Sequence, residues 1–319
     1  MMCLALLVVL VVFILLYRWH RQNQILPNLS DKHVLITGCD SGFGNLLAKQ
    51  LDRRGMLVLA ACLTEKGAES LKRESSSRLK TVILDVTNSQ SVSSAVTWVT
   101  GIVGNKGLWG LVNNAGISIP TAPNEWLTKE DFSKVLNVNL LGVVDVTIQM
   151  LPLIRKARGR IVNVASVAGR LTFCGGGYCM SKYGVESFSD SLRQDIIAFG
   201  VKVCIVEPGF FQTQVTDANL QKEFCRKAWA RLPEEVRQSY GQQYFEKHCE
   251  TIESTLSKSN SKLSLVTDCM EHALTAVYPW TRYSAGLDAK ILYLPISYFP
   301  TVIADFLIGL YKPKPAHSA

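Results

Sequence analysis

The sequence predicts an α/β fold in which a seven-stranded parallel sheet is doubly wound, with helices on both faces. From Lys32 onward, short and nearly continuous apolar runs alternate with helical patterns. Runs of this kind are typical of parallel strands that are covered on both faces. Polar residues gather directly after the runs, where the carboxyl ends of parallel strands form a ligand-binding edge.

Composition limits the classes of protein and of partner. The 319 residues are 48% apolar and 19% charged, which suits one sizeable core or at most two. The net charge of +8 suits a membrane surface or an anionic cofactor, but no basic run is interleaved with aromatics, so we expect no nucleic-acid partner. The 9 cysteines form no Cys-x-x-Cys pair and no ligand spacing with His. We therefore expect mostly buried free thiols and no metal site.

The N-terminus predicts a membrane anchor over residues 1–21. Residues 1–17 carry no charge, and Arg18, His20 and Arg21 follow at once. A helix of this length barely crosses a bilayer core of about 30 Å, so it suits a short anchor or an interfacial helix. A cleaved signal peptide is the alternative, but it would have a basic start and a small-x-small site. The basic flank favours a cytosolic body, whereas the sequon at Asn28 would matter only in a lumen.

A glycine-rich turn follows the first predicted strand, residues 33–37, in the order Gly38-Cys39-Asp40-Ser41-Gly42-Phe43-Gly44. Such a turn before a helix lets main-chain N–H groups approach a pyrophosphate. The second strand, residues 57–62, ends without the acidic residue that binds ribose hydroxyls or the basic one that binds a 2′-phosphate. Because Asp40 adds negative charge, we expect NAD rather than NADP. Lys66 is the residue that could reverse this preference.

Five further strands are expected along the chain, at residues 81–86, 108–112, 160–166, 201–206 and 289–294. The third to sixth of these seven strands end at Asp85, at Asn113-Asn114-Ala115-Gly116, at Ser166 and at Glu207-Pro208-Gly209. We expect the last long helix at residues 265–277.

Tyr178 and Lys182 are four residues apart after three glycines, so a helix would place them on one face. A phenol has a pKa of about 10, and a neighbouring ammonium favours the phenolate. Tyr178 could then exchange a proton with a substrate hydroxyl or carbonyl. Taken alone, the pair could equally be two exposed neighbours on a helix.

Taken together, the motifs resemble the short-chain dehydrogenase/reductase family over roughly residues 32–213. The matching features are Thr37-Gly38-x-x-x-Gly42-x-Gly44, Asn113-Asn114-Ala115-Gly116, Asn139, Ser166, Tyr178-x-x-x-Lys182 and Pro208-Gly209-x-x-x-Thr213. The stretches at residues 36–44, 107–116 and 271–274 are most similar to the membrane-bound retinol and hydroxysteroid dehydrogenases of that family. This similarity extends nearly from end to end.

The resemblance implies a Rossmann-type fold and a role for each matching residue. Tyr178 would exchange the proton with the substrate, Lys182 would lower the Tyr178 pKa and hold the nicotinamide ribose, and Ser166 would bind the substrate oxygen with Tyr178. Asn139 would hold a water that connects Lys182 to solvent. The residues expected to bind the cofactor are Gly38, Ser41, Gly42, Phe43, Gly44, Asp85, Asn113, Ala115, Gly116, Tyr178, Lys182, Pro208, Gly209 and Thr213.

Several of these residues have purely structural alternatives. Asn137 lies in the same helical stretch as Asn139, and only the family pattern distinguishes the two. Ser166 could simply bond the main chain, and Asp85 could cap the turn at Thr87. We expect His272 to be a packed or surface histidine and not a catalytic group.

We therefore expect one catalytic domain over residues 32–295, with a helical lid at about 210–262 that selects the substrate. The apolar, proline-containing tail at 296–319 should lie in the membrane interface. The implied function is reversible NAD-dependent oxidation of retinol or of a 3α- or 17β-hydroxysteroid at the endoplasmic reticulum membrane. A homodimer is expected from the resemblance alone. A non-catalytic dinucleotide-binding scaffold on the membrane is the alternative function.

Overall fold

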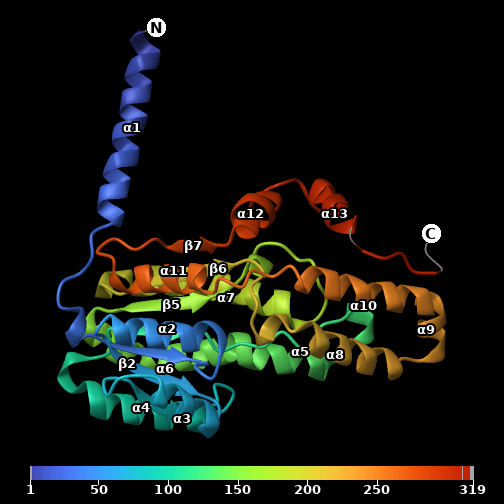
Figure 1. Ribbon diagram of the computed structural model, residues 1–319, viewed down its shortest axis with the longest axis horizontal. Helices are drawn as coiled ribbons and strands as arrows, with labels where there is room; N and C mark the ends of the chain where they lie inside the picture. The colour runs from blue at the N-terminus through green and yellow to red at the C-terminus, as the bar shows by residue number, and fades with distance from the viewer. Residues whose placement is uncertain (1, 311, 317–319) are drawn as a thin grey trace.

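A computed structural model describes residues 2–310 and 312–316, without the side chains of residues 2–5 and 8. Its centre is a seven-stranded sheet with the order β3-β2-β1-β4-β5-β6-β7 (Figure 1). All six strand pairs are parallel. The strands are β1 (His33–Thr37), β2 (Leu57–Cys62), β3 (Lys80–Ile83), β4 (Gly110–Asn113), β5 (Arg160–Val164), β6 (Lys202–Pro208) and β7 (Arg282–Ala285). The predicted doubly wound parallel sheet is confirmed.

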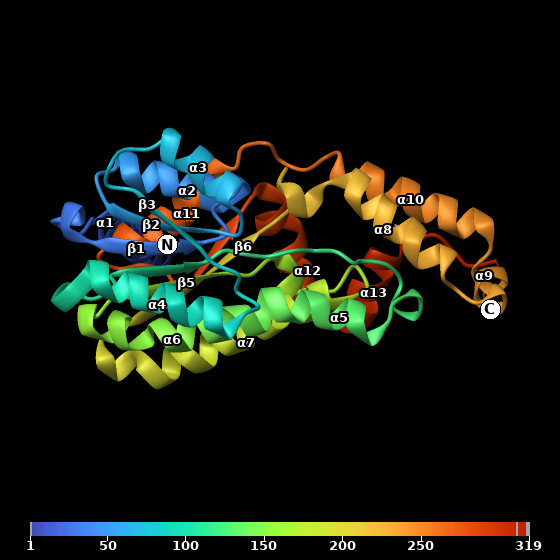
Figure 2. The same ribbon diagram turned by 90° about the horizontal axis from the view of Figure 1, so that it is seen from below.

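Helices cover both faces of the sheet (Figure 2). One face carries α2 (Gly42–Arg53), α3 (Glu65–Arg73) and α11 (Ser264–Thr275). The other face carries α4 (Ser89–Val103), α6 (Gly142–Ala157) and α7 (Gly177–Ile196). The central strands bury side chains toward both layers, which explains why their sequences are continuously apolar.

One helical run among the described residues, Lys129–Ala157, is long and apolar enough to cross a membrane. It consists of α5 (Lys129–Leu136), a π-helical segment (Asn137–Leu141) and α6. This run packs against α4 and α7 in the body of the protein. It is therefore a core helix, because its apolar side chains meet the sheet and the neighbouring helices.

The prediction of the seventh strand at residues 289–294 is wrong. The strand is β7, and the predicted segment is a π-helical turn, Ala289–Tyr293, that continues into α12 (Leu294–Ile296). Ile291 in this segment is 72% exposed, so its apolar character does not reflect burial in the sheet. β7 alternates between buried and half-buried residues, and the buried carboxylate of Glu186 holds its Arg282. Because the strand is not a continuous apolar run, the search for such runs did not find it.

The segment predicted as a lid contains three helices, α8 (Ala218–Ala230), α9 (Glu234–Tyr240) and α10 (Gln242–Leu256). These helices extend beyond the carboxyl edge of the sheet (Figure 2). Their apolar faces enclose Trp126, which is 1% exposed and contacts the rings of Trp229, Tyr240 and Tyr244. The aromatic residues of this region are therefore chiefly packed against one another.

The N-terminal helix α1 (Met2–Gln22) rises from the edge of the body on which α12 and α13 (Thr301–Gly309) also lie (Figure 1). Its described apolar side chains are exposed. The body holds only the base of α1, where His272 Nε2 lies 2.8 Å from the main-chain oxygen of Gln22. His272 also bonds the Tyr283 hydroxyl at 2.8 Å, so the expectation of a packed histidine is confirmed.

Candidate active site

Helix α7 presents Tyr178 and Lys182 on one face. It begins directly after Gly176, whose φ of +86° lies in the region that favours glycine. The ammonium nitrogen of Lys182 lies 5.7 Å from the centre of the Tyr178 ring. The structure therefore brings together the two side chains that the sequence singled out.

The Lys182 ammonium is buried and held from below by the sheet. Its Nζ donates a 2.8 Å hydrogen bond to the main-chain oxygen of Val164, the last residue of β5. Burial lowers the pKa of Lys182 to about 8, and the nearby Glu186 carboxylate partly opposes that decrease. At neutral pH the amine is therefore still mostly protonated.

Burial has the largest effect on the pKa of the Tyr178 phenol. Burial raises its pKa above the ordinary value, and a hydrogen bond with Ser166 opposes the rise only in part. The expectation that Lys182 makes this phenol more acidic is therefore not met in the chain alone. The physical reason is that desolvation penalises the phenolate, while the amine is directed to Val164.

Ser166 follows β5 and lies between Tyr178 and the end of β6. Its Oγ donates to the main-chain oxygen of Pro208 at 3.4 Å and accepts from the N–H of Ala168 at 3.1 Å. The main-chain bonds that were its structural alternative are thus present. The same hydroxyl also forms a hydrogen bond with Tyr178, so bonding to the main chain is compatible with a role in binding the substrate oxygen.

Asn139 occupies the π-helical segment and is 1% exposed, whereas Asn137 is exposed. Its Nδ2 donates to the main-chain oxygen of Ile117 at 2.8 Å and to Ser181 Oγ at 3.0 Å, and its Oδ1 accepts from the Ile117 N–H at 2.8 Å. Both side-chain donors are used, and one lone pair of Oδ1 is left for a water. A Cβ at Gly116 would lie 3.3 Å from Oδ1 and 3.8 Å from the Lys182 ammonium, so this glycine leaves space between the two groups.

The glycine turn after β1 is closely packed against the loop after β4. A Cβ on Gly44 would lie 2.4 Å from the main-chain oxygen of Gly38 and 2.5 Å from Asn114 Nδ2. Asn114 Nδ2 in turn donates to the main-chain oxygens of Thr37 and Gly38 at 2.9 and 3.1 Å. Side chains larger than hydrogen are therefore excluded, and the backbone of the turn stays accessible to a phosphate.

The loop after β6 lies on the other side of the glycine turn. We call the glycine turn together with the loops after β4 and β6 the cofactor cradle, or the cradle. A Cβ on Gly42 would lie 3.6 Å from Thr213 Cγ2, and the rings of Phe43 and Phe211 meet edge to face with centres 5.7 Å apart. Thr213, predicted from the far end of the motif series, is thus beside the glycine turn. Main-chain amides and small side chains around an open turn fit a dinucleotide.

Two predicted cofactor residues make other contacts. Asp85 accepts hydrogen bonds from the N–H and the hydroxyl of Thr87, at 2.9 and 2.7 Å, so the capping interaction is present. Asn113 is 2% exposed and donates to Thr147 Oγ1 and Asn163 Oδ1, both at 2.8 Å. Its side chain therefore points into the sheet, and only its main chain borders the cradle.

Residues that the sequence did not mark as site residues also shape the cradle. Asp40 accepts from the N–H groups of Leu63 and Thr64 at 2.7 and 3.0 Å, so its carboxylate lies at the end of β2. Asp288 accepts from the N–H of Phe210 at 2.7 Å, and a Cβ on Gly209 would lie 2.2 Å from its carboxylate. The sequence analysis used Asp40 only for its charge. Each acidic residue is distant in sequence from the loop it holds, so no local motif predicted either contact.

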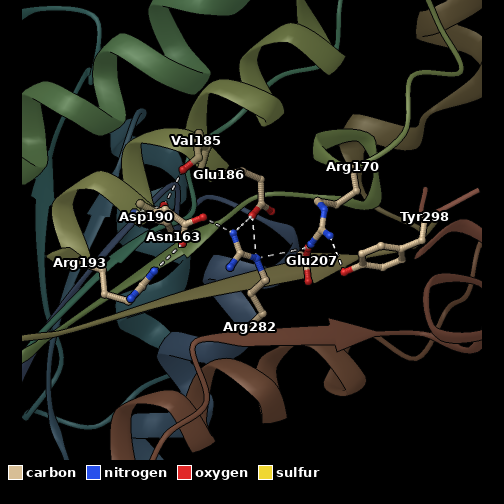
Figure 3. Close-up of polar contacts among 10 residues, drawn as sticks. Asn163, Arg170, Val185, Glu186, Asp190, Arg193, Glu207, Arg282 and Tyr298 are labelled. Carbon is tan, nitrogen blue, oxygen red and sulfur yellow. Dashed lines mark hydrogen bonds and ion pairs between the residues drawn. The ribbon is translucent and has the colours of Figure 1, made fainter. Parts of the chain in front are cut away.

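An ionic network around the buried carboxylates of Glu186 and Glu207 joins α7, β6, β7 and the tail (Figure 3). Arg282 contacts Glu186 at 3.0 Å, and Arg170 contacts Glu207 at 3.0 Å and the Tyr298 hydroxyl at 2.7 Å. Burial and the neighbouring Glu207 raise the pKa of Glu186 to about 7. The network links the tail at Tyr298 to the strand end that bonds Ser166.

Comparisons with known proteins agree with this geometry. Residues 32–223 match the sequence pattern of the family described as short chain dehydrogenase. Retinol dehydrogenase 7 of Rattus norvegicus is 58% identical over 95% of this chain and 96% of its own. The 17-beta-hydroxysteroid dehydrogenase type 6 of the same organism is also 58% identical, over 98% of each chain.

A solved short-chain dehydrogenase from Streptomyces avermitilis has a TM-score of 0.67 and 24% identity, covering 83% of this chain and 91% of its own. A second, from Burkholderia cenocepacia in complex with NADP, has a TM-score of 0.64 and 18% identity, covering 86% and 97%. These likenesses show the fold. The chain belongs to the short-chain dehydrogenase family, whose members are oxidoreductases that bind a nicotinamide dinucleotide.

Proposed function

We propose that this protein catalyses the reversible, NAD-dependent oxidation of a lipophilic alcohol to the aldehyde or ketone. Retinol and 3α- or 17β-hydroxysteroids are the proposed substrates, and the names of the two relatives support both classes. The observation that carries the proposal is the grouping of Tyr178, Lys182 and Ser166 at the carboxyl edge of the sheet, beside an open glycine turn.

In this proposal Tyr178 takes the proton of the substrate hydroxyl, and Ser166 bonds the same oxygen. The bound dinucleotide supplies the hydride acceptor. The hydrogen bond with Ser166 opposes the desolvation that raises the Tyr178 pKa. In the loaded site, the charged Lys182, whose Nζ lies 5.7 Å from the centre of the phenol ring, favours the phenolate as well. In the reverse direction the neutral phenol, which burial favours, donates the proton to the carbonyl oxygen.

The preference for NAD is supported by Asp40. Its carboxylate binds main-chain N–H groups at the end of β2, where a 2′-phosphate would have to lie. Two anions at this position would repel each other. Lys66, in the first turn of α3, is exposed to solvent. Solvent and salt therefore screen its attraction for a 2′-phosphate.

The proposal includes attachment to the endoplasmic reticulum membrane, through α1 and the C-terminal tail. Exposed apolar side chains on α13 include Val302 at 81% and Phe306 at 66%. Helix α13 lies on the same edge of the body as α1 (Figure 1). A lipophilic alcohol dissolved in lipid would then enter close to the site. A homodimer stays a prediction.

A substrate panel tests the function. NAD reduction would be measured with retinol, a 3α-hydroxysteroid and a 17β-hydroxysteroid, for the native protein and for Tyr178→Phe. We expect turnover of at least one alcohol and a loss of about 10²–10⁴ in kcat for the variant, with NAD affinity retained. No turnover of any alcohol by native protein that binds NAD would reject the proposal and favour a dinucleotide-binding scaffold.

A further inference from the structure

Two thiols lie in contact beside the candidate base. The sulfur atoms of Cys174 and Cys179 are 3.4 Å apart. Cys174 belongs to the loop before α7, and Cys179 is in the first turn of α7, directly after Tyr178. The intervening chain is Gly175-Gly176-Gly177-Tyr178, so flexible glycines separate the two cysteines.

The surroundings of Cys179 favour its thiolate. The thiol of Cys174 and the main chain of Phe173 and Cys174 hydrogen-bond its sulfur, and these bonds lower the pKa of Cys179 below that of an ordinary thiol in spite of burial. Its position in the first turn of a 20-residue helix acts in the same direction. Cys174 is partly exposed, whereas Cys179 is 2% exposed. A small oxidant can therefore reach the pair by way of Cys174.

Other described cysteines provide a comparison. Burial raises the pKa of Cys39, Cys62 and Cys204, so these are unreactive core thiols. Cys225 and Cys249 form a second hydrogen-bonded pair, which joins α8 to α10 in the lid. That pair lies on elements that do not carry Tyr178. It therefore offers a matched control.

We propose that Cys174 and Cys179 are an oxidation site at which a peroxide forms a reversible disulfide that slows the reaction at Tyr178. The Cys179 thiolate attacks one peroxide oxygen, the O–O bond breaks, and a sulfenic acid and hydroxide result. The Cys174 sulfur then attacks the Cys179 sulfur, and the hydroxyl leaves as water with the Cys174 proton. In total the peroxide takes two electrons from the two thiols. The hydroxide of the first step takes up the proton that Cys179 released, so two waters form.

The disulfide would move the loop rather than the helix. A disulfide is about 2.05 Å long, so the two sulfurs must approach by more than 1 Å from their present contact. Cys179 is buried in α7, whereas Cys174 follows Phe173, whose ring meets those of Phe210 and Tyr293 at 5.4 and 5.7 Å. These contacts connect the moving loop to the segment that follows Pro208.

The effect on rate rests on the proposed function, but the bond itself does not. Cys179 is the residue next to Tyr178 in α7, and its sulfur lies 3.4 Å from that of Cys174, so the bond would form beside the residue that carries the phenol. Negative charge on either sulfur also raises the pKa of Tyr178. A displacement of about 1 Å near reacting groups can cost up to about 100-fold in rate. The glycine turn and Thr213 lie on other elements, so dinucleotide affinity should be retained.

The digestion pattern gives a direct readout of the bond. Trypsin cuts after Arg170 and Lys182, so both cysteines fall in one peptide of residues 171–182. Full-length protein would be treated with hydrogen peroxide, alkylated, digested and weighed. We expect this peptide to lack alkyl groups and to be lighter by two hydrogens, whereas a sulfoxide at Met180 would add an oxygen.

Activity would be measured on the same samples. We expect peroxide to lower kcat/KM for the alcohol by about tenfold or more, without loss of NAD binding, and dithiothreitol to restore it. Cys174→Ser should resist peroxide. Cys225→Ser should respond as the native protein does, because its pair lies on α8 and α10, which do not carry Tyr178.

The outcomes separate the two hypotheses. Full alkylation of both cysteines after peroxide treatment would overturn the proposed site. A disulfide without a change in rate, or equal sensitivity of Cys174→Ser, would overturn its effect on the reaction. If reduced protein turns over no alcohol, the proposed function fails, while the peptide mass still decides whether the bond forms.

Discussion

Glu186 lies one helical turn beyond Lys182 on α7, and its carboxylate raises the pKa of the Lys182 ammonium against the effect of burial. The pKa of Lys182 is about 8, so the amine begins to lose its charge just above neutral pH. Arg282 holds the Glu186 carboxylate from β7 at 3.0 Å. The strand that the sequence analysis did not find therefore bears on the chemistry of the site.

On the alkaline side of the pH profile, Glu186→Gln should lose its activity in alcohol oxidation at a lower pH than the native protein does. Without the carboxylate, Lys182 is deprotonated at a lower pH, and the phenolate of Tyr178 loses the neighbouring positive charge. The alkaline limb of the pH profile of kcat should therefore move toward neutral pH. Asp190→Asn is the control, because Asp190 also contacts Arg282, at 2.6 Å, but does not shift Lys182. Identical alkaline limbs in the native protein and Glu186→Gln would contradict this role.

The same variant should change how stability depends on pH. Because the pKa of Glu186 is raised to about 7 from its model-peptide value of 4.5, the folded state keeps a proton that the unfolded state releases. The contribution of Glu186 to the free energy of unfolding is therefore greatest below pH 4.5 and is lost as pH rises through 7. Urea unfolding at pH 5 and pH 7.5 should show a smaller pH dependence in Glu186→Gln. An unchanged difference between the two pH values would show that Glu186 titrates normally.

Gly44→Ala should destabilise the protein and weaken dinucleotide binding. Its Cβ would lie 2.4 Å from a main-chain oxygen that belongs to the turn itself, so backbone must shift. We expect a loss of about 1–3 kcal/mol in unfolding free energy, as for overpacked sites. Gly101→Ala in α4 is the control, since its Cβ would meet no atom within 4 Å, and it should gain roughly 0.5–1 kcal/mol. Equal thermal midpoints for the two variants would refute the close packing of the turn.

Asp40→Asn should shift cofactor preference toward NADP. Removing one negative charge at the end of β2 reduces the repulsion of a 2′-phosphate, and we expect the ratio of Kd values for NADP and NAD to fall about tenfold. Asp31→Asn is the control, because this side chain is 69% exposed and precedes β1, at the opposite end of that strand from the turn. The ratio would be measured by titration with both dinucleotides. A ratio that stays constant would mean that another residue sets the preference.

The apolar surface of α13 should bind lipid on its own. A chain beginning at residue 22 retains the contacts of Gln22 and Gln24 with the body, so it should stay folded without α1. We expect this chain to float with phosphatidylcholine vesicles, and Val302→Ser with Phe306→Ser to reduce binding about tenfold or more. Ile197→Ser is the control, because this side chain is 66% exposed on a different element. Equal flotation of all three chains would exclude α13 as a contact.

The strands that form the sheet were predictable because a strand buried on both faces must be apolar along its length. Six of the seven predicted strands lie within a few residues of the observed ones. The seventh was missed because Arg282 and Ser284 make β7 polar. Two carboxylates of α7, the buried Glu186 and the half-buried Asp190, pair with Arg282 and compensate its charge. The run at residues 289–294 resembled a strand for a different reason, because it contains apolar side chains, Ile291 and Leu292, that are exposed and not buried in the sheet.

The sequence by itself determined the parallel sheet, the glycine turn and the pairing of Tyr178 with Lys182, because each depends on local spacing or on continuous burial. Only the tertiary structure decided that Asn114 closes the glycine turn, that Asp288 binds the N–H of Phe210, and that the Asn113 side chain points into the sheet. It also placed the sulfurs of Cys174 and Cys179 in contact. Distances between side chains depend on how helices pack and how loops fold, and no period in the sequence records them.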